Sequence, residues 1–341
     1  MNTRLGRLVG IATCFIAAAC GLAPTEVAVS PPSAPTEEVA APTPTMAPTE
    51  SACSLTKAET LLTTPGGTES IAIAEDGSIY TADFCSGEVF HIGADGSTSV
   101  IATLPYGLDN PECVDGGLGV AIAQDGTIRV VVWSPDVEHN GVWKVSSDGA
   151  VEFAFPMPPD SAPIPNDIAL DAQGNLYVTE SGAGAVWVAP PGNAAAPWLQ
   201  TDLLAPPAGQ DFGANGITRL GDVIYVTNLG AGTILQVPIE ADGSAGEPMV
   251  FATGINSPDG IAFDQQGDLY VSSPFGDQLV RVTPDGEVAI VADLGPLGVG
   301  FPTDVAFVPG PNGSNVVYLA NPNPDETTSV SRIGLCPAGG G

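Results

Sequence analysis

The sequence predicts an all-β fold, a six-bladed β-propeller closed by an N-terminal strand. First, one pattern occurs six times along the chain: a mostly polar position, a short apolar strand, a glycine-containing turn and a second strand. Second, the copies are spaced by 49, 48, 49, 44 and 44 residues, a period typical of propeller blades. Third, Asp-Gly pairs recur at hairpin positions, where glycine supplies the positive φ of a tight turn. The first positions of the six copies are Glu69, Leu118, Asn166, Asn215, Asp259 and Thr303.

The N-terminus has the pattern of an export signal. Arg4 and Arg7 precede an apolar run, residues 8–19, that is too short to span a bilayer as a mature helix. The following Ala17-Ala18-Ala19-Cys20 resembles a bacterial lipobox. We therefore expect a lipoprotein signal peptide over residues 1–19 and a lipidated Cys20 that anchors the protein to a membrane outside the cytoplasm, in the periplasm or at the cell surface. The alternative is an ordinary secretory peptide cleaved near the same place.

Two further regions follow the leader. Residues 20–52 are rich in Pro, Thr and Ala and show no apolar periodicity, which predicts a disordered stalk of extended chain. Residues 53–338 form the predicted propeller. The whole chain has 39 acidic and 8 basic residues. A surface this acidic repels phosphate backbones, so we expect no nucleic-acid partner. We expect a monomer.

Each blade should contain four antiparallel strands, and in the first blade these are residues 70–74, 78–83, 88–92 and 99–103. Because strands alternate in direction, the first residue of every inner strand lies on one face, close to the propeller axis. The loops between second and third strands and the links between blades lie on the same face. The Asp-Gly pairs lack the alternating carboxylates and closing Glu of an EF-hand, so they are predicted to be structural turns.

The last blade has only three strands of its own, residues 303–308, 315–320 and 328–335. Residues 58–63 are predicted to supply its fourth strand and so to close the ring.

Four cysteines follow the leader and stalk, an even number that suggests disulfides in an exported protein. In the blade arrangement Cys336 ends a third strand and Cys53 shortly precedes the closing strand, which predicts a Cys53–Cys336 bond. Cys85 and Cys113 fall on the same face, which makes a Cys85–Cys113 bond plausible.

Four of the six first positions carry side-chain oxygens that should point to one place on the axis: Glu69, Asn166, Asn215 and Asp259. Two carboxylates and two amide carbonyls suit a hard divalent cation, Ca2+ above all. The sequence offers no His or Cys cluster for zinc or copper. The alternative is a water-filled channel mouth lined with polar residues.

Three short motifs follow Glu69, one in each of three blades: Pro165-Asn166-Asp167, Ala214-Asn215-Gly216 and Ser257-Pro258-Asp259-Gly260. Through these motifs the sequence resembles the SMP-30/gluconolactonase/LRE-like family over roughly residues 58–335. The resemblance implies a six-bladed propeller with calcium in its axial tunnel and a lactonase activity. It implies that Glu69, Asn215 and Asp259 are calcium ligands, and that Asn166 binds the metal or the substrate.

The chain also departs from the family pattern. Ile164 stands where sugar-lactonase members often have Arg, which disfavours a sugar lactone, and Ser70-Ile71 follow Glu69 where Gly-Pro is common. For catalysis we consider Asp259, shared between ligation and proton transfer, and His139, which lies in a loop on the active face. The alternative for His139 is an exposed loop residue.

Polar residues also end several predicted second strands on the active face, where they either line a pocket or cap turns: Asp83, Glu180, Asn228, Ser273 and Asn321.

The expected function is a membrane-anchored, calcium-dependent hydrolase of a small-molecule lactone or ester. The alternative is a non-catalytic NHL-type propeller that acts as a binding or scaffold module, and a strictosidine-synthase-like propeller shares the same architecture. No Gly-x-Ser-x-Gly elbow, P-loop or Cys-x-x-Cys motif is present, which disfavours serine hydrolase, NTPase and redox functions.

Overall fold

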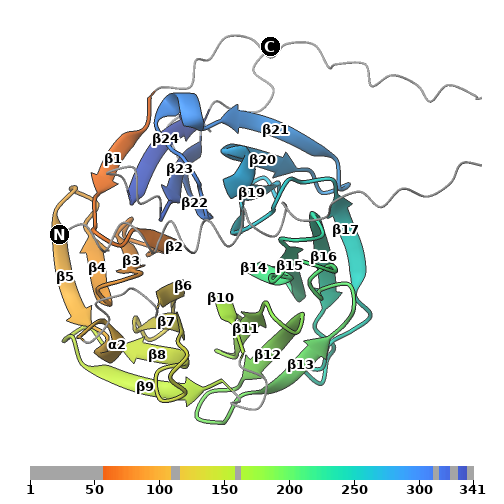
Figure 1. Ribbon diagram of the computed structural model, residues 1–341, viewed down its shortest axis with the longest axis horizontal. Helices are drawn as coiled ribbons and strands as arrows, with labels where there is room; N and C mark the ends of the chain where they lie inside the picture. The colour runs from red at the N-terminus through yellow and green to blue at the C-terminus, as the bar shows by residue number, and fades with distance from the viewer. Residues whose placement is uncertain (1–56, 109–115, 158–162, 310–314, 323–328, 336–341) are drawn as a thin grey trace, which may run out of the picture.

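The structure, a computed structural model, describes residues 57–108, 116–157, 163–309, 315–322 and 329–335. These residues form six four-stranded antiparallel sheets arranged around a central axis (Figure 1). The predicted all-β, six-bladed propeller is confirmed. The predicted leader, the lipidation site Cys20 and the stalk lie outside the described residues.

Each blade begins at the axis and ends at the rim. Blades one to three are β2 (Thr68–Ile73), β3 (Ile79–Asp83), β4 (Glu88–Ile92) and β5 (Thr98–Thr103); β6 (Gly116–Ile122), β7 (Ile128–Trp133), β8 (Gly141–Val145) and β9 (Val151–Pro156); and β10 (Pro165–Leu170), β11 (Leu176–Glu180), β12 (Ala185–Ala189) and β13 (Ala196–Gln200). Blades four and five are β14 (Ala214–Leu220), β15 (Val223–Asn228), β16 (Thr233–Pro238) and β17 (Met249–Thr253); and β18 (Ile261–Phe263), β19 (Leu269–Ser273), β20 (Gln278–Val282) and β21 (Val288–Asp293).

The sixth blade closes the ring with strands from both ends of the domain. It contains β22 (Asp304–Pro309), β23 (Asn315–Ala320), β24 (Val330–Leu335) and, at its rim, β1 (Glu59–Leu62). β1 lies beside β24 (Figure 1), and the two strands pair antiparallel with Glu59 opposite Arg332. The predicted closure by an N-terminal strand is therefore confirmed. Arg332 also forms an ion pair with Glu59, and this pair is largely exposed.

Helical structure among the described residues is limited to short turns on the links and loops: α2 (Pro105–Leu108), η2 (Pro274–Gly276) and η3 (Gly295–Leu297). No helix in the described part of the chain is long and apolar enough to cross a membrane.

The hairpin turns confirm the structural role of the Asp-Gly pairs. Gly77 and Gly126, like the other paired glycines, have φ near +80°, a conformation that side chains with a Cβ rarely adopt. The Asp76 and Asp125 carboxylates accept hydrogen bonds from the backbone N–H groups two residues later. These carboxylates therefore hold turns in place.

β-Bulges occur at two places in the blades. The outermost strand of each of the six blades carries one, which disturbs an otherwise open edge and discourages pairing with another chain. A second set of bulges lies near the first residues of four inner strands, β2, β6, β10 and β14. In β2, for example, Glu69 and Ser70 lie between the paired residues Thr68 and Ile71. Bulges of this kind redirect side chains.

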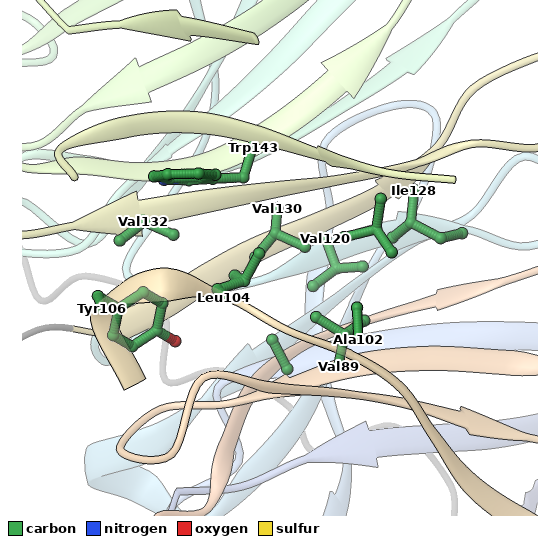
Figure 2. Packing of buried hydrophobic residues seen from close by; sticks show 11 residues of the cluster. Val89, Ala102, Leu104, Tyr106, Val120, Ile128, Val130, Val132 and Trp143 are labelled. Carbon is green, nitrogen blue, oxygen red and sulfur yellow. The ribbon is translucent and has the colours of Figure 1, made fainter. Parts of the chain in front are cut away.

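The apolar core lies between blades. Six hydrophobic clusters occupy the six interfaces between neighbouring blades. Figure 2 shows the cluster between blades one and two, in which Val89, Leu104 and Val130 are fully buried and to which Trp143 also belongs. Because the blades bury their apolar faces against each other, the axis remains available for polar side chains.

Candidate metal centre

Four predicted site residues meet at one narrow cavity on the axis: Glu69, Asn166, Asn215 and Asp259. The cavity is also lined by the residues that follow them and by two residues of blade six: Ser70, Asp167, Gly216, Gly260, Thr303 and Asp304. Leu118, the corresponding residue of blade two, does not line the cavity. It packs instead into the hydrophobic cluster between blades two and three.

Hydroxyl groups fix the backbone of the axial residues from the preceding blade. Thr179 Oγ1 donates to the carbonyl of Asn215 at 2.6 Å, and Thr227 Oγ1 donates to that of Asp259 at 3.0 Å. Thr303 Oγ1 donates in the same way to the carbonyl of Glu69 at 2.7 Å. These bonds connect one blade to the next, so they hold the axial positions relative to each other.

The residues at the second position of the inner strands form a further set of contacts between blades. Asp304 Oδ2 accepts hydrogen bonds from Ser70 Oγ and Ile71 N, both at 2.9 Å, which joins blade six to blade one. Asp167 Oδ2 accepts from Ile217 N at 2.9 Å, which joins blade three to blade four. Our reading of the sequence missed Asp167 and Asp304, although each is adjacent to a first position.

Glycine occupies the second position where two blades approach most closely. A Cβ on Gly216 would lie 2.2 Å from the carbonyl oxygen of Asp259, and one on Gly260 would lie 2.2 Å from Asp304 Oδ1. No side chain fits at either place. The Asn-Gly and Asp-Gly steps of the repeat therefore reflect packing between blades as well as the chemistry of the first residue.

The cavity concentrates carboxyl groups whose charged forms are disfavoured. Burial raises the pKa of Glu69 well above its usual value, and the neighbouring Asp259, Asp167 and Asp304 raise it further. Burial and then Asp304 and Asp167 raise the pKa of Asp259 in the same way. The pKa of Asp167 rises to about 8 and that of Asp304 to about 6, in both cases chiefly through burial. No Lys, Arg or His contributes to any of these shifts.

The donor atoms fit a hard cation. The Oδ1 atoms of Asn166 and Asn215 are buried and accept no hydrogen bond from the described residues, and an unsatisfied buried polar atom is costly. Within the described residues no three or more His, Cys, Asp and Glu side chains are grouped so that they could hold a metal ion. The candidate site therefore depends on the two amide oxygens as much as on Glu69 and Asp259. Such an all-oxygen set suits Ca2+.

The structure does not bring His139 to this cavity, because His139 is not among the lining residues. Its backbone N–H donates to the carbonyl of Asp136, and its own carbonyl accepts from Trp143 Nε1 at 3.0 Å. Its ring centroid lies 6.3 Å from that of Trp143. The assignment of His139 as a catalytic base therefore stays a prediction, because the structure does not place its side chain at the axial cavity.

The polar residues at the ends of second strands cap loops and links. Asp83 accepts from the backbone N–H groups of Gly66, Cys85 and Ser86. Glu180 accepts in the same way from the backbone of Ile164, Gly182 and Ala183. Asn228 and Ser273 also hydrogen-bond backbone groups of loops and links. Of the two predicted roles for these residues, capping is the one that these bonds show.

A larger cavity, of about 350 Å³, is lined by the opposite ends of the inner strands of blades one to four. The residues that line it are aliphatic except for Thr218 and Arg219. Arg219 Nε donates to the carbonyl of Leu170 at 3.1 Å. This cavity contains no carboxylate, so the axial cavity remains the candidate for chemistry.

Cys85 is the one cysteine among the described residues, and it is disulfide-bonded. The other cysteines of the two predicted bonds, Cys53, Cys113 and Cys336, lie outside the described residues. The predicted pairings are therefore untested.

Comparison with solved structures shows the same fold in several proteins. A gluconolactonase from Xanthomonas campestris has a TM-score of 0.62 and 16% sequence identity, over 81% of this chain and 89% of that one. Regucalcin from Agrobacterium tumefaciens, a calcium-binding protein, has a TM-score of 0.61 and 18% identity, over 82% and 93%. Virginiamycin B lyase from Staphylococcus aureus, with quinupristin, has a TM-score of 0.54 and 17% identity, over 79% and 80%.

A search of the curated proteins finds no match to this chain. The SMP-30/gluconolactonase/LRE-like region, in contrast, matches residues 137–319, which is more than half of the 341-residue chain. This match includes Asn166, Asn215 and Asp259 of the axial cavity. The chain therefore belongs to the SMP-30/gluconolactonase/LRE-like family.

Proposed function

We propose that this propeller binds Ca2+ through Glu69, Asn166, Asn215 and Asp259 and hydrolyses a lactone or ester at that site. The observation that carries the proposal is the axial cavity, in which the carboxyl groups of Glu69 and Asp259 meet two buried amide oxygens that accept no hydrogen bond from the described residues. Buried carboxylates without a countercharge are unstable in an apolar interior. A divalent cation would supply that charge and use the amide oxygens as ligands.

When bound, the cation would polarise the substrate carbonyl and stabilise the negative charge that develops on its oxygen. A water molecule would attack the carbonyl carbon through its oxygen atom. Asp259 would accept a proton from this water molecule during the attack. The same proton would then pass to the departing alkoxide as the carbon–oxygen bond breaks, so that a lactone yields a hydroxy acid. Asp167 and Asp304 would not react; they would hold the inner strands that present the ligands.

The chain around the site supports a substrate less polar than a sugar lactone. Ile164 stands where related sugar lactonases often have Arg, and its backbone N–H donates to Glu180 Oε1 at 2.9 Å. Its apolar side chain has no donor that could hold sugar hydroxyl groups. A lactone or ester with few hydroxyl groups therefore suits this chain better.

We further propose that the protein is exported and is attached to a membrane through a lipidated Cys20, so that it acts in the periplasm or at the cell surface. The leader pattern supports it, and so does the disulfide at Cys85, because disulfides persist in oxidising compartments. Radiolabelled palmitate should enter the wild-type protein and not the Cys20→Ala variant. Equal labelling of both proteins would contradict lipidation at Cys20.

The metal site is tested by titrating Ca2+ into the chelator-treated mature chain in a calorimeter. The chain carries Cys20→Ser so that it remains soluble. We expect one site in this protein, loss of binding in Asp259→Ala, and no change in the control Asp242→Ala, which removes an exposed turn carboxylate. Equal binding by all three proteins would refute the axial site. Binding without hydrolysis of any lactone or aryl ester would favour the alternative, a non-catalytic binding module.

A further inference from the structure

Backbone strain is concentrated in one sector of the face that carries the axial cavity. Three described residues other than glycine have positive φ: Ser257 (48°), Asp277 (48°) and Phe301 (53°). Ser257 and Phe301 occupy equivalent places, each two residues before an axial residue of its blade, Asp259 and Thr303 respectively. Such conformations are energetically unfavourable and cluster at functional sites. For a bulky residue such as Phe301 the conformation is especially rare.

Hydrogen bonds join the three strained segments. Asp277 Oδ1 accepts from Phe301 N at 2.7 Å, and the Asp277 carbonyl accepts from Leu294 N at 2.7 Å. Phe275 N donates to Ser257 Oγ at 3.2 Å. The loop between β19 and β20 is thereby fixed to the links that enter blades five and six. The strain is maintained by these contacts and holds the segments in one arrangement.

This arrangement presents a pair of aromatic rings. The ring centroids of Phe275 and Phe301 are 5.5 Å apart and their planes meet at 73°, the edge-to-face geometry that aromatic pairs favour. Phe275 is 43% exposed, and it is the one aromatic residue among the large hydrophobic side chains that the described part of the chain exposes. Since Phe301 is two residues from Thr303, which lines the cavity, its backbone is at most about 7 Å from that of Thr303.

We propose that Phe275 and Phe301 form an apolar wall of the substrate site, which selects a neutral lactone or ester with an alkyl or aryl substituent. The inference rests on the proposed hydrolase function and names its substrate class. The axial cavity would take the reacting carbonyl, and the aromatic pair would take the substituent. The chain's net charge of −31 disfavours an anionic substituent.

The test compares two lactones with the same ring, δ-valerolactone without a substituent and δ-decalactone with an alkyl tail. In the mature full-length chain, Phe275→Ala should lower kcat/KM for δ-decalactone about 10-fold and that for δ-valerolactone less than 2-fold. Phe301→Gly, which tolerates the positive φ, should have the same selective effect. The control Val100→Ala removes an exposed apolar side chain of β5 and should change neither value. An equal loss of kcat/KM for both lactones, or no loss for either, would refute the proposal that Phe275 and Phe301 form this wall.

Binding of the corresponding lactams, which resist hydrolysis, separates this inference from the proposed function. If the wild-type protein hydrolyses neither lactone, the proposed function fails. The wall still predicts that the calcium-loaded protein binds the alkyl-substituted lactam about 10-fold more tightly than the unsubstituted one, and that Phe275→Ala removes the difference. Calorimetric titration that shows no such preference in the wild-type protein would refute the wall. Ca2+ affinity should be the same in both proteins.

Discussion

Asp304 is expected to contribute to stability through the hydrogen bonds with which it joins blade six to blade one. In Asp304→Ala the buried groups Ser70 Oγ and Ile71 N lose this acceptor. A buried donor without an acceptor costs about 1–3 kcal/mol. At pH 4, where the raised pKa of Asp304 (about 6) keeps its carboxyl group protonated in the folded state, the two losses together should therefore lower the free energy of unfolding by roughly 3 kcal/mol.

The measurement is urea unfolding of the chelator-treated protein, followed by tryptophan fluorescence and circular dichroism. Asp242→Ala is a matched control, because Asp242 also accepts from a backbone N–H and a hydroxyl, both from Ser244, but is exposed. Water can replace the lost acceptor there, so the control should cost less than about 1 kcal/mol. Equal losses in the two variants would refute the reasoning, because they would mean that burial between blades does not determine the cost.

Three other predictions concern the cavity and the core. Gly216→Ala should lower thermal stability and Ca2+ affinity together, because its Cβ would lie 2.2 Å from the Asp259 carbonyl, whereas Gly96→Ala, with no atom near its Cβ, should leave Ca2+ affinity unchanged. In calorimetric scans without metal, stability should fall as the pH rises from about 4 to 8. The raised pKa values of groups such as Asp304 (about 6) and Asp167 (about 8) mean that the folded state holds more protons than the unfolded state over this range. Saturating Ca2+ should remove most of this decline, and a stability that rises over the same range would contradict the raised pKa values of the buried carboxyl groups. Val130→Ala should cost about 2–3 kcal/mol in urea unfolding, since Val130 is fully buried between blades one and two, and a cost below about 1 kcal/mol would mean that this interface repacks.

The sequence by itself was sufficient for the architecture and for the location of the candidate site. The six-fold repeat determines the number of blades, and a strand has a side-chain period of two, so equivalent positions of each copy must face the same way. For this reason the repeat alone predicts that four side chains meet at one place on the axis: Glu69, Asn166, Asn215 and Asp259. The closure by β1 could also be predicted, because the last copy lacked a strand.

Contacts between blades, in contrast, were decided by the tertiary structure. The repeat does not reveal which backbone N–H of the next blade faces a carboxylate, because that depends on the bulges in the inner strands and on the rotation between neighbouring sheets. Asp304 therefore looked like an ordinary strand residue, and Asp83 could equally have lined a pocket. The pairing of Phe275 with Phe301 could not be predicted for the same reason, since it joins a loop of blade five to the link that enters blade six.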